Sequence, residues 1–402
     1  MQGHQKPAQN VVIVGGGFGG LYTALALAQR KHHPPVLLIE PNDRFLFLPL
    51  LYELLSGELR GWEIAPRYDG LLAGRGLAWL QDRVVRIDAE QQQLQTAAGR
   101  TLSFGRLVIA TGAESNTFAV PGAERHCLGF RSLADVRRLQ HLVAELKGQR
   151  KPLQRIAVVG AGPTGVELAC KLADMAEGSA VIELIEQGPG LLPQARAFNR
   201  EQAALALQRR DVRLRTRTQV EAVEAGAIAL RCHPEGDSPA HAETLAVRAA
   251  VWTAGLNFRA PRIDPAPACD GRGRLLCGPD LRLLGHGDLF VAGDLAAPVD
   301  PEGAAGEAPA SPATAQVAFQ QAPVLAANLI RSLRGEPLEP FGWKDLGEMM
   351  SLGIGEASLT AAGVTLAGPA AYQLRRLAYL TRLPGRPHQL RVAAGWLADW
   401  TP

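Results

Sequence analysis

The stretch VVIVGGGFGGLYTALALA, residues 11–28, decides the fold, because a β-branched run, a cluster of glycines and an apolar run follow one another without a charge. That order predicts a buried strand, a tight turn and a helix. The same order returns at residues 156–173 as IAVVGAGPTGVELACKLA. Three glycines recur with a displacement of 145 residues: Gly15, Gly17 and Gly20 become Gly160, Gly162 and Gly165. We therefore expect two strand–turn–helix units of the type that binds dinucleotides.

Each of the three glycines has its own physical role in such a unit. The first permits the turn, the second lets the backbone approach a pyrophosphate, and the third lets helix and strand pack closely. The helix N-terminus then offers free N–H groups to the phosphates. Each copy is followed by a second apolar strand ending in an acid, Glu40 or Glu186, 25 and 26 residues after the first glycine. A carboxylate there accepts hydrogen bonds from a ribose diol and repels a 2′-phosphate, so Glu186 favours NADH over NADPH.

Composition describes an ordinary globular chain. Of its 402 residues, 47% are hydrophobic and 20% charged, and the formal net charge of +3 is too small to indicate nucleic acid as the main partner. The five cysteines form no C-x-x-C pair, which is typical of free thiols in a reducing compartment. The histidines show no paired-ligand spacing, so no metal site is predicted. No apolar stretch is long enough and free enough of glycine and charge to predict a membrane span.

The rest of the chain adds two patterns. Residues 82–112 alternate like a β-meander with a turn at Ala98-Gly99. The tail, residues 371–402, contains two helical pieces separated by Pro384, with apolar residues on one side and arginines on the others. This pattern fits a helix in an anionic membrane interface. It fits equally an amphipathic helix that docks on the protein or on a second subunit.

Four segments resemble the type II NADH dehydrogenases, which are single-chain flavin NADH:quinone oxidoreductases with two dinucleotide-binding domains. The segments are FLFLPLLYELLSGEL at 45–59, GAGPTGVELA at 160–169, AQVAFQQ at 315–321 and GEMMSLGIGEA at 347–357. The resemblance covers about residues 10–360. Within the family, the short length and compact tail are similar to the cyanobacterial branch that reduces demethylphylloquinone.

The resemblance implies an α/β fold with two Rossmann-like dinucleotide-binding domains and a small amphipathic C-terminal segment. The implied boundaries are 1–117 with 260–337 for the FAD domain, 118–259 for the NAD(P)H domain and 338–402 for the C-terminal membrane-association or dimerisation segment. FAD would be held by the first glycine motif and its acid, by backbone contacts of Val84 to adenine, and by residues near the flavin: Gly15, Gly17, Gly20, Glu40, Val84, Thr111, Gly112 and Asp294. NADH would be held by the second motif and its acid: Gly160, Gly162, Gly165 and Glu186.

The resemblance also assigns the reacting region. Glu167 would lie near the junction of nicotinamide and flavin, and Gln316, Gln320 and Gln321 beside the isoalloxazine ring, where a quinone approaches. Neutral amides suit this place, because they donate hydrogen bonds to carbonyl oxygens that gain negative charge. Protons would come from water or through Glu167. Leu346 departs from the family, which often has a lysine there.

The implied activity is FAD-dependent NAD(P)H:quinone oxidoreduction without proton pumping: a hydride passes from NADH to FAD, then two electrons to a membrane quinone, naphthoquinone or benzoquinone. The tail would associate with the cytoplasmic face of a membrane, and the protein would be a homodimer. Two alternatives stay open. One is a flavoenzyme like the sulfide:quinone reductases, which rely on cysteines near the flavin, with Cys127 as a candidate. The other is a sensor that binds flavin and NADH and turns over slowly.

Overall fold

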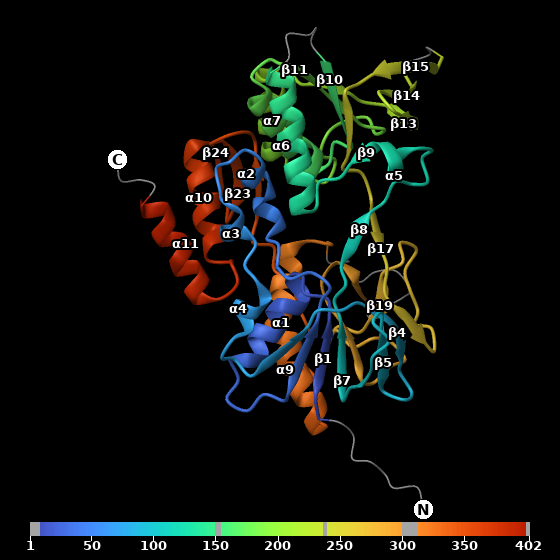
Figure 1. Cartoon of the computed structure of the whole chain (residues 1–402), viewed down its shortest axis with the longest axis vertical. Helices are drawn as coiled ribbons and strands as arrows, with labels where there is room; N and C mark the ends of the chain where they lie inside the picture. Colours follow the sequence, from blue (N-terminus) through green and yellow to red (C-terminus); the bar gives the residue numbers. More distant parts are fainter. Residues whose placement is uncertain (1–8, 149–153, 236–238, 300–311, 399–402) are drawn as a thin grey trace, which may run out of the picture.

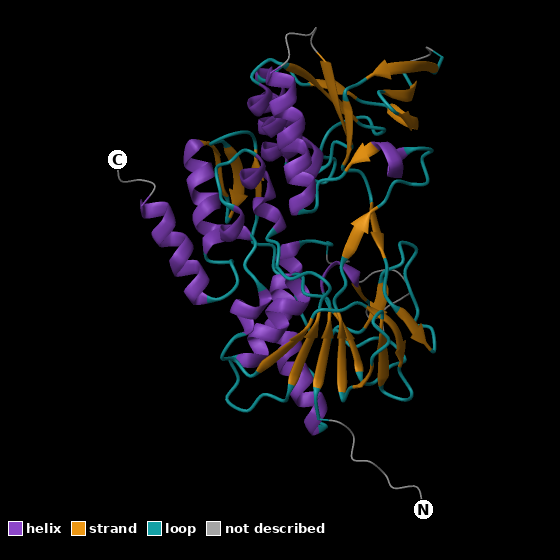
Figure 2. Ribbon diagram, viewed as in Figure 1, coloured by secondary structure: helices purple, strands orange, loops and turns teal. Residues whose placement is uncertain are grey.

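The computed structural model describes residues 9–148, 154–235, 239–299 and 312–398. Two lobes are stacked along the long axis, and the C-terminal helices lie along one side of the molecule (Figure 1). Each lobe contains a parallel sheet with helices against it (Figure 2). A short antiparallel pair, β8 (Ala113–Ser115) with β17 (Leu256–Phe258), lies between the lobes.

The lower lobe is organised around β1 (Val11–Val14), whose four residues are all buried. The sheet has the order β20-β7-β1-β2-β3 and every pairing is parallel. The other strands are β2 (Val36–Ile39), β3 (Leu77–Leu80), β7 (Arg106–Ile109) and β20 (Leu289–Val291). Helices α1 (Phe18–Ala28) and α9 (Ala315–Arg334) pack together against this sheet (Figure 1). A central strand covered in this way is apolar throughout, which explains the β-branched run of the sequence.

The upper lobe repeats this plan. Its sheet has the order β12-β11-β10-β16-β9, with β10 (Gln154–Val159) between β11 (Ala180–Ile185) and β16 (Ala249–Trp252). The outer strands are β9 (Cys127–Leu128) and β12 (Arg213–Arg215). The longer helices of this lobe are α6 (Leu133–Gly148), α7 (Pro163–Ala176) and α8 (Ala197–Arg209). The expected α/β fold with two Rossmann-like units is confirmed.

Smaller sheets flank both lobes. The expected meander is present as β4 (Val84–Asp88), β5 (Gln93–Thr96) and β6 (Thr101–Ser103), with β18 (Arg262–Asp264) parallel to β4. In the upper lobe, β13 (Thr218–Glu224), β14 (Ala227–Cys232) and β15 (His241–Ala246) are antiparallel. The remaining short elements are η1 (Leu48–Leu50), α2 (Leu51–Leu55), α3 (Gly61–Ile64), α4 (Tyr68–Leu72), α5 (Ala123–His126), β19 (Leu275–Cys277), η2 (Gly293–Leu295) and β21 (Ala296–Pro298).

The tail forms a hairpin sheet and two helices: β22 (Glu348–Ser351), β23 (Ala357–Ala361), β24 (Val364–Gly368), α10 (Pro369–Leu380) and α11 (Arg386–Ala398). The division of the tail at Pro384 is as expected. One expectation is wrong, because Arg375 does not lie on an outer side of its helix but is 1% exposed. Its burial is explained by a buried carboxylate, Glu53, to which it donates a hydrogen bond. Among the described helices, none has the length and hydropathy needed to cross a bilayer.

Candidate functional site

Both glycine turns have the same backbone conformation. Gly15 and Gly160 each have φ of +101°, which L side chains rarely adopt. A Cβ on Gly20 would lie 1.9 Å from the carbonyl oxygen of Gly15, and one on Gly165 would lie 1.8 Å from that of Gly160. The first and third glycines of each copy are therefore required by the turn and by the close approach of helix to strand.

The middle glycines face open space. Gly17 and Gly162 are the N-cap residues of α1 and α7, and neither helix has a side-chain cap. A Cβ on either residue would meet nothing within 4 Å. Unsatisfied N–H groups and the positive end of a helix dipole thus point to room for an anion in both lobes. This arrangement fits the phosphates of a dinucleotide.

Each lobe also holds its glutamate in the same way. Glu40 accepts a hydrogen bond of 2.7 Å from the backbone N–H of Gly16, and Glu186 accepts one of 2.8 Å from that of Ala161. The second carboxylate oxygen of Glu186 accepts from the N–H of Gly188 at 2.7 Å. Both carboxylates are therefore oriented beside the glycine turn, at the end of the second strand, where a ribose would lie.

The two glycine motifs open onto one cavity of about 2000 Å³. Ten of the expected nucleotide-binding residues line it: Gly15, Gly17, Glu40, Val84, Thr111, Gly112, Asp294, Gly160, Gly162 and Glu186. Gly20 and Gly165 instead lie behind the wall, where they permit packing. Burial raises the pKa of Asp294, and the nearby Arg131 partly opposes this. A continuous cavity that contains both motifs can place two dinucleotides against each other.

The expected reacting residues do not line that cavity. Gln316 and Gln320 donate hydrogen bonds from α9 to the backbone carbonyls of Gly347 and Lys344, at 3.2 and 2.9 Å. The buried Gln321 accepts a hydrogen bond of 2.7 Å from the N–H of Gly293, the neighbour of Asp294. The first two amides thus fasten α9 to the segment before β22. The third fixes the turn that carries Asp294.

Glu167 lies in a buried cluster that sequence analysis missed. It is 7% exposed and accepts a hydrogen bond of 2.6 Å from the N–H of Ser351. Arg375 of α10 lies with Nη2 3.9 Å from Glu167 Oε1 and also donates to Glu53. The Tyr52 side chain lies close to Glu167 and to Thr164, and Thr164 lines the cavity. Glu167 is therefore separated from the cavity wall by the Tyr52 side chain.

The electrostatics of this cluster are unusual. Burial raises the pKa of Glu167 to about 7, while Arg375 and the N–H of Ser351 lower it and Glu53 raises it. Burial also raises the pKa of Tyr52 well above its usual range, with Glu167 adding to this. A carboxyl group that titrates near neutral pH can both give and take a proton.

One sequence signal could have indicated the cluster. Glu53 is an acid inside the apolar segment 45–59, and a buried charge needs a partner. The partner, Arg375, is 322 residues away in the chain. Nothing in the local pattern of the tail identifies it.

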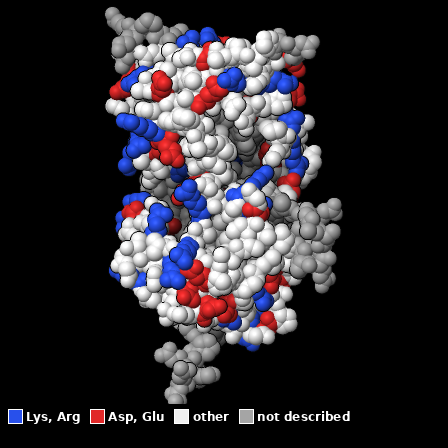
Figure 3. Space-filling view, turned by 90° about the vertical axis from the view of Figure 1, so that its right-hand side faces the viewer, with Lys and Arg blue, Asp and Glu red and all other residues white. Residues whose placement is uncertain are grey.

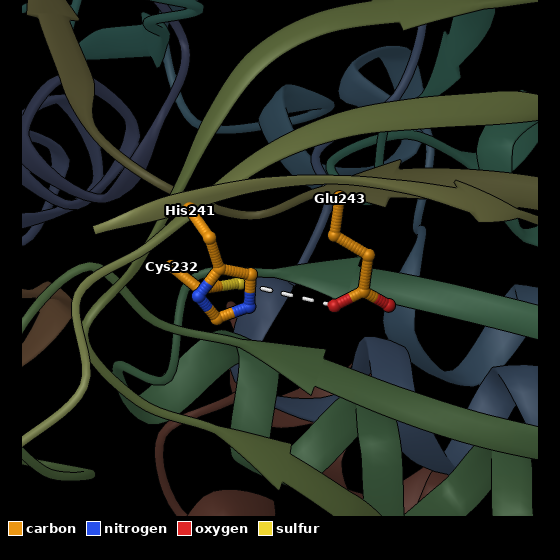
Figure 4. Close-up of side chains that lie close together, drawn as sticks. All are labelled: Cys232, His241 and Glu243. Carbon is orange, nitrogen blue, oxygen red and sulfur yellow. Dashed lines mark hydrogen bonds between the residues drawn. The ribbon is translucent and has the colours of Figure 1, made fainter. Parts of the chain in front are cut away.

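A second polar group lies apart from the cavity. Cys232, His241 and Glu243 of β14 and β15 bring three possible ligand atoms within 4.8 Å of one another (Figure 4). The carboxylate of Glu243 already binds Arg215, with Nη1 to Oε2 at 2.9 Å. We therefore do not assign a metal centre to this group, in which a guanidinium already neutralises the acid.

Comparisons with known proteins agree with this geometry. Residues 9–322 match the model of the pyridine nucleotide-disulphide oxidoreductase family. The chain is 38% identical to a demethylphylloquinone reductase of Synechocystis, over 97% of both chains. It is 33% identical to an alternative NAD(P)H-ubiquinone oxidoreductase of Arabidopsis thaliana, over 96% of this chain and 80% of the relative. The fold resembles NDH2 of Plasmodium falciparum in complex with NADH, with a TM-score of 0.82 and 18% identity, over 95% of this chain and 97% of that one.

Proposed function

The chain belongs to the pyridine nucleotide-disulphide oxidoreductase family and within it to the type II NADH:quinone oxidoreductases, and from this premise we propose how its residues divide the reaction. It is an FAD-dependent NAD(P)H:quinone oxidoreductase. When bound, FAD and NAD(P)H supply the hydride chemistry, and a quinone is the acceptor. The protein's own part is to bind, to orient, to exclude water and to handle protons.

The lower lobe holds FAD and the upper lobe holds NADH in this proposal. The observation that carries it is the single cavity onto which both glycine motifs open. Glu186, whose carboxylate is fixed beside the second motif, selects NADH by repelling a 2′-phosphate. The domain boundaries predicted above, 1–117 with 260–337, 118–259 and 338–402, belong to the same proposal.

Glu167 supplies protons for quinone reduction. Its burial supports this role, because burial raises its pKa to about 7, and so does its place beside Tyr52, which lies next to Thr164 at the cavity wall. Gln316 and Gln320 hold the segment before β22 against α9, and Gln321 holds the turn before Asp294. In this arrangement the three glutamines shape the approach of the quinone.

The quinone is a naphthoquinone in our proposal, supported by the similarity to a demethylphylloquinone reductase over almost the whole chain. Anaerobic stopped-flow spectroscopy tests the full reaction. We expect NADH to bleach the yellow protein faster than NADPH does, and a naphthoquinone to restore the colour faster than a benzoquinone. Bleaching by NADH without recovery of the colour on addition of either quinone would exclude a quinone as the acceptor. Steady-state turnover with quinone separates an enzyme from a slow redox sensor.

Association with the cytoplasmic face of a membrane, through the tail, is the proposed localisation, and a homodimer the proposed assembly. Leu390 and Leu397 of α11 are 72% and 68% exposed, which suits insertion among lipids or contact with a second subunit. All five cysteines are free, as is typical of a reducing compartment. Co-sedimentation with vesicles and size-exclusion chromatography test the two parts separately.

The sulfide alternative has less support. Cys127 lies in β9 and is not among the residues that line the cavity. Burial raises its pKa to about 11, which keeps the thiol protonated at neutral pH. Because the thiolate is the nucleophile in such chemistry, this cysteine is poorly suited to attack or to carry sulfur.

A further inference from the structure

A second cavity, of about 320 Å³, lies between α4 and α11, and we call it the arginine pocket. Four arginines and one acid line it: Arg44, Arg67, Arg75, Arg391 and Asp69. Its lining overlaps that of the nucleotide cavity only at Arg44 and Ala65. In Figure 1, α4 and α11 lie on the same side of the molecule. None of the residues assigned to cofactor or proton chemistry lines this pocket.

The positive charge of the arginine pocket is only partly neutralised. Arg67 binds both nearby acids, with Nη1 2.9 Å from Asp43 and Nε 3.0 Å from Asp69. Arg44 also lies near Asp43, at 3.7 Å. Within the described part of the chain, Arg75 and Arg391 have no carboxylate partner, and Arg75 uses only Nε, to the carbonyl of Leu71 at 2.8 Å. Two guanidinium groups therefore remain available to an anion at one cavity.

The histidine of the pocket, His388, adds no positive charge at neutral pH. His388, which also lines the pocket, has its Nε2 2.8 Å from the carbonyl oxygen of Glu63, so this nitrogen donates. Burial lowers the pKa of His388; that hydrogen bond opposes the shift and Arg391 adds to it. The imidazole is therefore neutral at pH 7, and the positive charge of the pocket comes from its arginines.

The two tail helices, one of which lines the pocket, expose several leucines. Leu390 precedes Arg391 directly, and Leu397, seven residues on, lies on the same face of α11; both are well exposed. Leu374 and Leu377 of α10 are 48% and 55% exposed. A pocket with unneutralised guanidinium groups and helices with exposed leucines together match a ligand that has an anionic phosphate at one end and hydrocarbon at the other. By contrast, acidic and basic side chains are interspersed on the face shown in Figure 3.

We propose that the arginine pocket binds the phosphate headgroup of an anionic phospholipid through Arg75 and Arg391. The inference rests on the membrane association proposed above and adds a defined site to it. The headgroup phosphate occupies the pocket while its acyl chains lie along the exposed leucines of α10 and α11. Attachment then depends on particular arginines rather than on the overall charge of the tail.

The test uses the full-length, FAD-loaded protein and co-sedimentation with two vesicles, one of phosphatidylcholine and one with about a third phosphatidylglycerol. The variant R75Q/R391Q removes the two available charges. The matched control, R125Q/R138Q, removes two exposed arginines of α5 and α6, which line neither cavity. If each arginine contributes about fivefold to the affinity for anionic vesicles, R75Q/R391Q should bind them roughly 30-fold more weakly than the wild type. R125Q/R138Q should bind them about as well as the wild type.

Three results would overturn the proposal. Equal losses in both double variants would show a diffuse electrostatic effect without a site. Unchanged binding of R75Q/R391Q would show that these arginines are not used. Stabilisation of the wild type, but not of R75Q/R391Q, by millimolar inorganic phosphate without vesicles would assign the pocket to free phosphate instead of lipid. NADH oxidation by a water-soluble naphthoquinone should be the same in all proteins, and its absence would count against the proposed function alone.

Discussion

Removing the charge of Arg375 should move the pH dependence of quinone reduction toward higher pH. Arg375 Nη2 lies 3.9 Å from Glu167 Oε1. At an effective dielectric constant of about 20, Coulomb's law gives about 4 kcal/mol for that separation, equivalent to about three pKa units. In R375M the pKa of Glu167 should therefore rise from about 7 by one to three units. If protonated Glu167 is the donor, activity persists to correspondingly higher pH.

The opposite shift provides the control. Glu53 raises the pKa of Glu167, so E53Q should lower it and bring the loss of activity to lower pH. The assay is kcat for NADH and a water-soluble naphthoquinone from about pH 6 to 10, with flavin bleaching by NADH measured alone. Bleaching should keep its pH dependence in both variants, because it needs no protein acid.

Folding is a concern in R375M, because Glu53 would be buried without its partner, at a cost of about 3–5 kcal/mol. The double variant R375M/E53Q removes both charges and should fold. The midpoint of its pH dependence of kcat should lie between those of the single variants. Shifts of both single variants in the same direction, or reduced rates with no shift, would refute an electrostatic role of Arg375 at Glu167.

Three further predictions concern the same molecule. First, E167Q should become more stable than the wild type as pH rises from about 4.5 to 7, by up to about 3 kcal/mol in the free energy of thermal unfolding. Over this pH range Glu167 ionises in the unfolded protein but stays protonated in the folded one, which destabilises the wild type. A pH-independent difference would contradict the raised pKa. Second, E186Q should raise kcat/KM for NADPH relative to NADH about tenfold, since a repelling charge is lost; an unchanged ratio would place cofactor selection elsewhere. Third, Q320L should slow flavin reoxidation by quinone at least about tenfold and leave bleaching by NADH intact, because the hydrogen bond that positions the segment of Lys344 is lost; equal slowing of both steps would argue against a role at the quinone.

The nucleotide folds were predictable because their determinants are local. The turn at Gly15 needs a positive φ, and Gly20 must lack a Cβ, so residue type alone reports the geometry. The spacing from Gly15 to Glu40 covers one helix and one strand, which places the acid at the same sheet edge as the turn. Such local features can be recognised in a single sequence.

The tail was not predictable in the same way. Periodicity in α10 predicts that Leu374 and Leu377 share an apolar side, toward a membrane or a protein surface, and that the arginines lie on the other sides. In the structure Leu377 is 55% exposed, which is compatible with this, but Arg375 is 1% exposed, which the periodicity did not predict. The reason is a long-range one: Glu53 is fully buried and requires a counter-charge, and α10 is rotated so that Arg375 supplies it. No local pattern contains that requirement.

The orientation of α10 also affects what the loss of activity in a protein without the tail would mean. The helix presents Leu377 to solvent and Arg375 to Glu167, so its two faces serve different parts of the proposed function. Deleting the tail removes the exposed leucines of α10 and α11 and also leaves Glu53 and Glu167 without their buried cation. Loss of activity in a truncated protein therefore cannot be assigned to release from the membrane. The variants R75Q/R391Q and R375M separate attachment from proton chemistry, because Arg75 and Arg391 line the arginine pocket whereas Arg375 belongs to the buried cluster of Glu53 and Glu167.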